Sequence, residues 1–314
     1  MGRIRETFEK NKLRASRIAN IITPTRNGLI CVKFNGLCED YYNIDMVTDP
    51  GRFCLIKEFD EFIRHTKSEN FQIVSPQDIL DNKLSGRDVL IFFEGGYYNN
   101  YLAVDVLKKH NAKATFFPIP YNIKTGFAFW EDIIYRNEIN RMKPERIRER
   151  IKIFSTRDNQ DIIRFINEKY SEYAVWPKSD FDRPMNIEEL AIFKEFDEVI
   201  IGNTSLESTP LKRHKDEVIK NISMANDFFG AICNDFPNTL YYPEGFYDDE
   251  IADEIRNSQN EIKIALCGID GCNSEEYLSD ENNLLRLKTK TFPGFKSSHR
   301  EKRIEQILDI GFFE

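Results

Sequence analysis

The chain has 314 residues, of which 41% are hydrophobic and 31% charged, and its formal net charge at pH 7 is -8. This composition is typical of a globular protein with a real core. The acidic balance argues against nucleic acid as the main partner, because phosphate-binding proteins need a positive surface. No stretch approaches the ~18 consecutive apolar residues that a membrane span requires. We therefore expect a globular protein with no nucleic-acid partner and no membrane span.

Residues 1–27 are predicted to form an extension ahead of the main domain. Basic residues alternate with apolar ones over residues 1–22, which indicates an amphipathic helix. Such a helix most often packs on its own domain or on a partner subunit, so a protein partner or a homo-oligomer is expected through it, with a membrane surface as the alternative. The N-terminus has no apolar segment of a secretory signal, and the six cysteines are expected to be free thiols in a cytoplasmic protein.

Short apolar runs and helical periods alternate along the first half of the main domain. Strands are predicted at 28–34, 71–74, 88–93 and 114–117, and helices at 51–66 and 99–110. A further helix start is predicted where a capping Ser75 precedes Pro76 and an acid follows three residues later. The run at 88–93 is continuously apolar, as expected for a strand that is buried on both faces.

The second half continues the same alternation. Residues 144–196 are rich in helical periods, with a second capping box at Asn186–Glu189; strands are predicted at 198–201, 239–242 and 262–266, and helices at about 214–229 and 247–258. Strands that alternate with helices imply right-handed crossovers and a mostly parallel sheet. We therefore predict an α/β fold, a TIM-like and incomplete barrel, that occupies residues 28–314 as one domain with a helical insertion around 122–185.

Several segments resemble the NodB-homology polysaccharide deacetylases, carbohydrate esterase family 4. Val89–Tyr97 (VLIFFEGGY) is similar to their first catalytic motif, usually Thr-Phe-Asp-Asp-Gly-Tyr, and Lys113–Phe117 to the strand that follows it. Ile200–Leu211 resembles the second motif, and Tyr241–Gly245 the third, which supplies one wall of the groove. The resemblance runs from about residue 28 to at least 290 and implies an incomplete (β/α)7 barrel.

The resemblance also implies a chemistry. In active relatives an Asp and two His hold a divalent metal, usually zinc, and a neighbouring Asp deprotonates the attacking water. Carried onto this sequence, Glu94 stands at the position of that base, and Gly95, Thr204 and Ser208 stand at the three metal ligands. Glycine has no side chain and neutral hydroxyls are poor zinc ligands. We therefore expect no metal cofactor, although zinc is typical of the family.

Few other residues of the chain could replace the missing metal ligands. The chain has four histidines, and His65 and His110 are predicted near helix C-termini, where a structural role is the default. A rebuilt site from Glu94, Glu207 and His214 is conceivable. No Leu-x-His segment is recognisable near the C-terminus, so the general acid of the family has no counterpart.

A carbohydrate-binding groove is expected to remain around the altered positions. Its predicted lining consists of Gly95, Gly96, Tyr97, Thr204, Ser208, Tyr241, Tyr242, Pro243 and Glu244. Aromatic rings at such positions can stack on sugar rings, although most are core residues. Glu94 either acts as the base, or it only caps a turn or forms a salt bridge with a neighbour.

Three functions follow from this pattern. The favoured hypothesis is a polysaccharide deacetylase-like protein of glycan or surface-polysaccharide biosynthesis or modification, catalytically degenerate, that binds carbohydrate. The second is an active N-acyl sugar hydrolase with an altered site centred on Glu94. The third is a structural subunit of a polysaccharide-assembly complex.

Overall fold

The computed structural model describes residues 28–41, 44–211, 217–234, 236–258, 260–292 and 294. The helix that we predict within residues 1–22 lies outside this part of the chain, and so do His214 and His299. The docking role of the N-terminal helix therefore stays a prediction.

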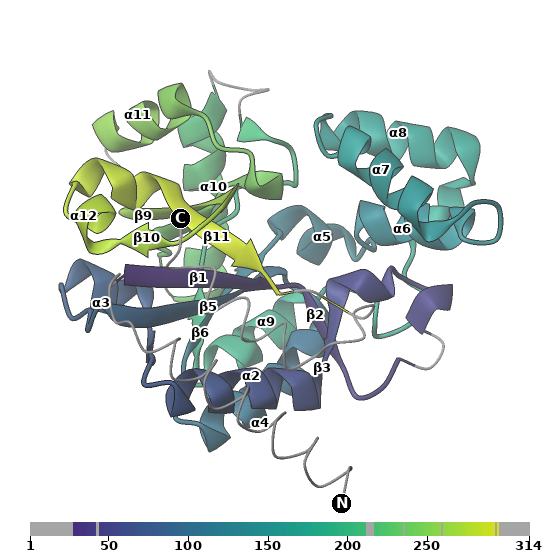
Figure 1. The fold of residues 1–314 in the computed structure, drawn as a ribbon. Helices are drawn as coiled ribbons and strands as arrows, with labels where there is room; N and C mark the ends of the chain where they lie inside the picture. Colours follow the sequence, from purple (N-terminus) through teal and green to yellow (C-terminus); the bar gives the residue numbers. More distant parts are fainter. Residues whose placement is uncertain are drawn as a thin grey trace, which may run out of the picture.

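Seven parallel strands form the centre of the molecule. They are β1 (Gly28–Phe34), β5 (Arg87–Gly95), β6 (Ala114–Pro118), β7 (Val199–Ile201), β8 (Thr239–Tyr241), β9 (Ile264–Asp270) and β11 (Leu287–Thr291). They follow one another around a curled sheet in chain order, and β11 returns to pair with β1 (Figure 1). At the seam between β7 and β8, Asn203 and Leu240 form an isolated parallel bridge. The predicted TIM-like, incomplete (β/α)7 barrel is confirmed.

Three short strands and the crossover helices complete the barrel. β4 (Gln72–Val74) pairs with β5, β10 (Asn273–Ser274) pairs with β1, and β2 (Gly36–Cys38) and β3 (Phe53–Leu55) form a separate pair. The helices between strands are α2 (Ile56–Ser68), α3 (Pro76–Leu80), α4 (Leu102–Lys109), α9 (Ile187–Lys194), α10 (Val218–Cys233), α11 (Asp249–Asn257) and α12 (Glu275–Leu278).

Both predicted capping boxes are present. The Ser75 side chain accepts a hydrogen bond from the backbone N–H of Asp78, and Asn186 accepts one from Glu189. The helix predicted at 51–66 was placed too early, because Phe53–Leu55 forms β3 beside β2 and α2 begins at Ile56. Pairing across the sequence overrides the helical spacing there.

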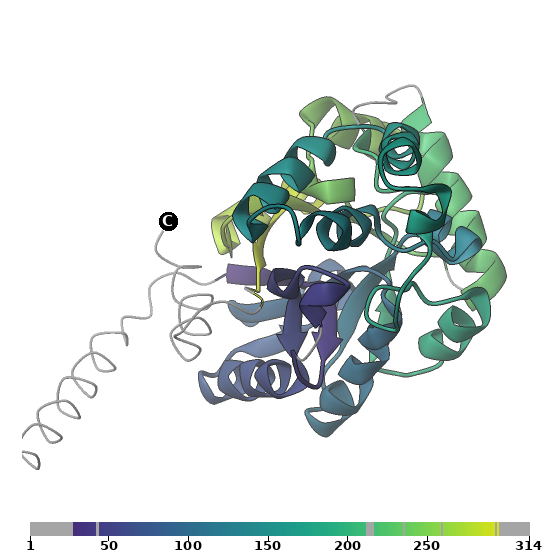
Figure 2. The same cartoon turned by 90° about the vertical axis from the view of Figure 1, so that its right-hand side faces the viewer.

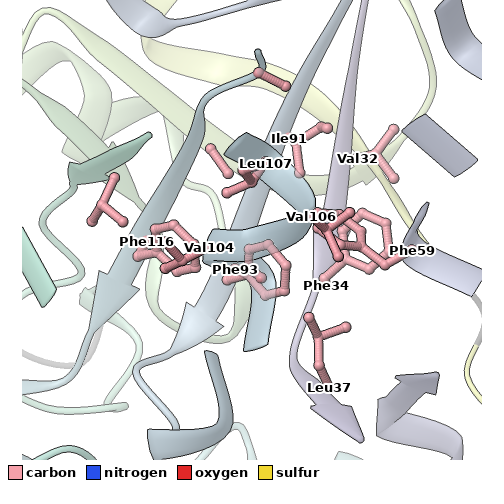
Figure 3. Packing of buried hydrophobic residues seen from close by; sticks show 14 of the residues in the cluster. Val32, Phe34, Leu37, Phe59, Ile91, Phe93, Val104, Val106, Leu107 and Phe116 are labelled. Atoms are coloured by element: carbon pink, nitrogen blue, oxygen red, sulfur yellow. The ribbon is translucent and has the colours of Figure 1, made fainter. Parts of the chain in front are cut away.

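The alternation of side chains along β1 and β5 separates two layers of core. Val32 and Phe34 of β1, like Ile91 and Phe93 of β5, point outward and pack under the covering helices (Figure 3). The residues between them belong to a cluster inside the barrel, which includes Leu29, Cys31, Leu90, Phe92 and Tyr241. By the same period of two, the side chains of Lys33 and Glu94 point inward, at the carboxyl ends of their strands.

The connection from β6 to β7 consists largely of helices. These are α5 (Pro120–Thr125), α6 (Trp130–Glu138), α7 (Pro144–Phe154) and α8 (Asn159–Lys169), and α6, α7 and α8 share a hydrophobic cluster of their own. α6, α7 and α8 lie together on the right of Figure 1, the side that faces the viewer in Figure 2. Arg148 of α7 makes two hydrogen bonds to Asp49, of 2.5 and 2.7 Å, which tie these helices to the segment that precedes β3.

Within the described residues, no helix combines the length and the apolar character that crossing a bilayer demands.

Candidate functional site

Two neighbouring strands bring opposite charges together at the carboxyl end of the barrel. β1 and β5 pair in parallel with Lys33 opposite Phe92 and Phe34 opposite Phe93. Because both side chains point inward, Lys33 Nζ lies 2.8 Å from Glu94 Oε2, and the two side chains are 17% and 14% exposed. Enzymes built on such barrels hold their reacting groups at this end, so the pair lies at the candidate site.

Further donors hold the pair in place. Asn35 Nδ2 donates to the same Glu94 oxygen at 3.3 Å, and Lys33 Nζ donates to the Tyr241 hydroxyl at 3.3 Å. Burial by itself disfavours both charges, but each partner's charge and the hydrogen bonds outweigh it, so the pKa of Lys33 is raised and the pKa of Glu94 is lowered. Both groups are therefore ionised at neutral pH.

A second ion pair lies beside the first one. Arg52 Nη1 is 2.9 Å from Glu131 Oε1 and 3.9 Å from Asp132 Oδ1. The Tyr97 hydroxyl donates to Asp132 at 2.7 Å, and Thr48 donates to the other oxygen of that carboxyl. Burial raises the pKa of Asp132 to about 7; Arg52 opposes the shift and the charge of Glu131 adds to it.

Glu244 supplies a fourth carboxyl, after Glu94, Glu131 and Asp132, and its backbone is strained. Its φ is 57°, in the left-handed region that non-glycine residues rarely adopt. Burial raises the pKa of Glu244 well above its usual value, and the charges of Glu131 and Glu94 raise it further. Within the described residues its carboxyl takes part in neither a hydrogen bond nor an ion pair. Glu244 therefore holds its proton to a higher pH than an ordinary glutamate, whereas Glu94 releases its proton at a lower one.

The positions predicted for metal ligands do not fit zinc. Gly95 has a φ of 103° and offers no ligand, and the Thr204 hydroxyl is buried and donates to the Tyr241 carbonyl at 3.2 Å. Ser208 lies in the loop after β7. The ammonium of Lys33, bonded to Glu94, would repel a divalent cation there. Among the residues that the structure describes, no three or more His, Cys, Asp or Glu side chains are grouped to hold a metal.

The tyrosines predicted to line a groove are buried instead: Tyr97 and Tyr241 form the floor of the site, and Tyr242 lies in a separate cluster with residues of α10 and α11. Tyr97 and Tyr242 are 0% exposed and Tyr241 is 1% exposed. The Tyr97 ring packs on Phe129 with 4.0 Å between ring centroids, and the Tyr242 hydroxyl donates to the Leu285 carbonyl. Gly96 and Pro243 are also buried. Tyr97 packs beside Phe129 of the insertion, Tyr241 packs inside the barrel, and Tyr242 packs with residues of α10 and α11. None of these rings has an exposed face on which a sugar could stack.

The sequence pattern did not lead us to Lys33, Asn35, Arg52 or Glu131. A signal existed for Lys33, since it is a lone charged residue within the apolar strand at 28–34. Arg52 and Glu131 carry no such signal, because a turn and a distant helix bring them together.

A small polar pocket lies next to the loop that follows β7. Its volume is about 150 Å³, and its lining includes Gln160, Ser205, Glu207, Thr209 and Asn221. Hydroxyl, amide and carboxylate groups of this kind can bind sugar hydroxyls. Glu207, which we considered as a replacement metal ligand, lines this pocket.

Comparisons with known proteins agree with the fold. Residues 81–262 match the model of the polysaccharide deacetylase family. Similar solved structures include a polysaccharide deacetylase from Bacillus cereus (12% identity over 89% of this chain and 69% of that one, TM-score 0.60). The Streptococcus pyogenes deacetylase PplD in complex with acetate is similar over 91% of this chain and 99% of its own (14% identity, TM-score 0.59). IcaB from Ammonifex degensii matches over 90% of this chain and 97% of its own (13% identity, TM-score 0.58). The search among curated proteins gave no match.

Proposed function

The chain belongs to the polysaccharide deacetylase family, and we propose that it binds carbohydrate in glycan or surface-polysaccharide metabolism without metal-dependent deacetylation. The observation that carries this proposal is the ion pair between Lys33 and Glu94, 2.8 Å apart, beside a glycine at the predicted metal position. The chain itself supplies a fixed cation where relatives are expected to use a bound one.

The electrostatics of the pair support a loss of the ancestral chemistry. A general base works best when its pKa lies near the working pH. The pKa of Glu94 is lowered, and one of its oxygens already accepts hydrogen bonds from Lys33 and Asn35. A carboxylate held in this way is a weak base.

The test combines metal content, activity and binding in the full chain. We expect no stoichiometric zinc or cobalt by mass spectrometry after incubation with each ion, no acetate release from N-acetylglucosamine oligomers, and measurable binding of those oligomers by calorimetry. One tightly held ion, together with acetate release that Glu94→Gln abolishes and the exposed-site control Glu188→Gln retains, would overturn the proposal.

A second candidate is a metal-independent N-acyl sugar hydrolase. The opposite pKa shifts of Glu94 and Glu244 favour it, because two carboxyls with separated pKa values are the usual arrangement of a base and an acid. Water would lose a proton to Glu94 as it attacks the acyl carbon, and the leaving amine would receive one from Glu244. This candidate predicts metal-independent acetate release that Glu94→Gln and Glu244→Gln each abolish; activity unchanged in either variant would exclude it.

The structural-subunit hypothesis depends on residues 1–22, outside the described part of the chain. Deletion of these residues with no change in oligomeric state or in co-purified partners would count against it.

A further inference from the structure

Four aromatic side chains of the helical insertion are exposed or half-buried. We call Tyr121, Phe127, Tyr173 and Trp176 the aromatic strip. Trp176 is 49% exposed and Tyr173 69% exposed, while Tyr121 and Phe127 are half-buried. Tryptophan is highly buried on average. A half-exposed Trp next to other aromatic rings therefore indicates a binding surface.

Three rings of the strip are linked by contacts at Phe127, and Tyr173 lies three residues before Trp176 in the chain. Phe127 meets Trp176 edge to face, with 5.1 Å between centroids and 85° between planes. Tyr121 also meets Phe127 edge to face, with 6.3 Å between those centroids. The backbone N–H of Ala128 donates to the Val175 carbonyl at 2.9 Å, which ties the two halves of the strip together.

Buried polar groups fix the loop that carries Trp176. Arg136 donates to the carbonyls of Ala174 and Trp176, at 2.5 and 2.8 Å, and pairs with Asp182. The Asp182 carboxylate in turn accepts hydrogen bonds from the backbone N–H groups of Lys178 and Ser179. Because Arg136 is 5% exposed and Asp182 0% exposed at the side chain, the loop is held from beneath. A binding loop fixed in this way loses little conformational entropy when a ligand arrives.

The strip leads to the polar pocket beside β7. The backbone N–H of Tyr121 donates to the Leu206 carbonyl at 2.9 Å, and Leu206 lines that pocket together with Ser205 and Glu207. The backbone of Tyr121 thus joins the strip to a segment that lines a pocket of hydroxyl, amide and carboxylate groups. A sugar chain presents the same two chemistries, since each pyranose ring has C–H faces and a rim of hydroxyls.

We propose that the aromatic strip is a sugar-stacking subsite that extends the pocket beside β7 along a polysaccharide chain. This inference rests on the proposed carbohydrate-binding function and names the surface that performs it. The neighbouring exposed side chains, Lys124 and Lys178, are polar, which suits a hydroxyl-rich ligand better than the apolar face of a protein partner. Trp176 and Phe127 would supply the stacking surface, and Tyr121 would connect it to the pocket.

The test uses the length of the ligand. We titrate the full chain with the dimer and the pentamer of N-acetylglucosamine and with the matching glucose oligomers, by calorimetry. We expect the pentamer to bind more tightly than the dimer. Trp176→Ala should raise the pentamer Kd by about tenfold, the equivalent of about 1.4 kcal/mol, and leave the dimer Kd within about twofold. Trp176→Phe, which keeps a ring, should retain most of the affinity.

A matched control separates this effect from a general change of surface. Phe236 is 57% exposed and follows α10, so Phe236→Ala should leave both Kd values unchanged, with thermal unfolding as the check that each variant is folded. Absence of glycan binding in the wild type would overturn the proposed function and this inference together. Binding that Trp176→Ala leaves intact would overturn the inference alone, and so would a change of oligomeric state in that variant without a change in Kd.

Discussion

The floor of the barrel and the aromatic strip use similar residues in opposite ways. At the floor, Tyr97 and Tyr241 are buried and the charges of Lys33 and Glu94 are paired with each other. On the strip, Trp176 and Tyr173 point to solvent from a loop that is fixed from below. Polar and aromatic residues that converge at strand ends can therefore stabilise the fold without binding a ligand. Exposure on a fixed loop is the better sign of recognition.

The largest effect on stability is expected from a substitution of Lys33, which belongs to the buried ion pair at the floor. Removal of one partner from a mostly buried pair leaves the other charge uncompensated, so Lys33→Met should lower the free energy of unfolding by about 3 kcal/mol in urea titrations. The double variant Lys33→Met/Glu94→Gln should recover much of that loss. The control Lys83→Met removes a pair with Asp81, 62% and 34% exposed, and should leave the free energy of unfolding unchanged, because water screens such a pair. Equal losses of unfolding free energy in Lys33→Met and Lys83→Met would contradict a structural role for the pair of Lys33 and Glu94.

Two glycines, one near the floor and one beside the aromatic strip, should differ in how much stability an added side chain costs. Gly96 has a φ of 77°, and a Cβ there would lie 2.5 Å from Pro118 Cβ. Gly96→Ala should therefore cost about 2 kcal/mol from backbone strain and steric overlap together. Gly126 has a φ of 69°, but its nearest atom, in the Trp176 ring, is 3.8 Å from the Cβ position. Gly126→Ala should cost about 1 kcal/mol from the backbone alone, and chemical denaturation compares the two.

Asp132 makes the stability of the floor depend on pH. Its folded-state pKa of about 7 exceeds the value of about 3.9 expected in the unfolded chain. Between these values the unfolded chain releases the proton first, so the contribution to stability is greatest below about pH 4 and is lost as pH rises towards about 7. We expect the wild type to lose about 1 kcal/mol per pH unit relative to Asp132→Asn between about pH 4.5 and about pH 6.5. Parallel pH profiles for the two proteins would show that the Asp132 proton is not linked to folding.

The smallest effect on stability is expected on the strip. Trp176 is 49% exposed, so Trp176→Ala should change the free energy of unfolding by less than about 1 kcal/mol. Trp130, at 3% exposed, is the matched residue in the core of the insertion, and Trp130→Ala should cost about 3 kcal/mol or more. A large loss at Trp176 would mean that the strip is part of the fold and not a free surface.

Local patterns in the sequence determined the barrel. The capping boxes at Ser75 and Asn186, and the apolar run within β5, depend on neighbours a few residues away, so both could be predicted. β11 could not, because Lys288 and Lys290 interrupt its apolar pattern and its strand character depends on pairing with β1 and β9. Residues 53–55 were predicted as helix although they form a strand, because that strand depends on pairing with β2, which lies elsewhere in the sequence.

In the site, too, some features follow from the local sequence and others only from the tertiary structure. The sequence pattern placed Glu94 at the end of a buried strand, and the resemblance to the deacetylase family put Gly95 and Thr204 where metal ligands would be expected. Tertiary structure alone decided that Lys33 bonds to Glu94, that Arg52 meets Glu131, and that the tyrosines are covered. Lys33 and Glu94 are 61 positions apart in the chain, and Arg52 and Glu131 are 79 positions apart (131 − 52). A local pattern records what a residue can do, and burial and charge pairing across the fold decide which of those properties is used.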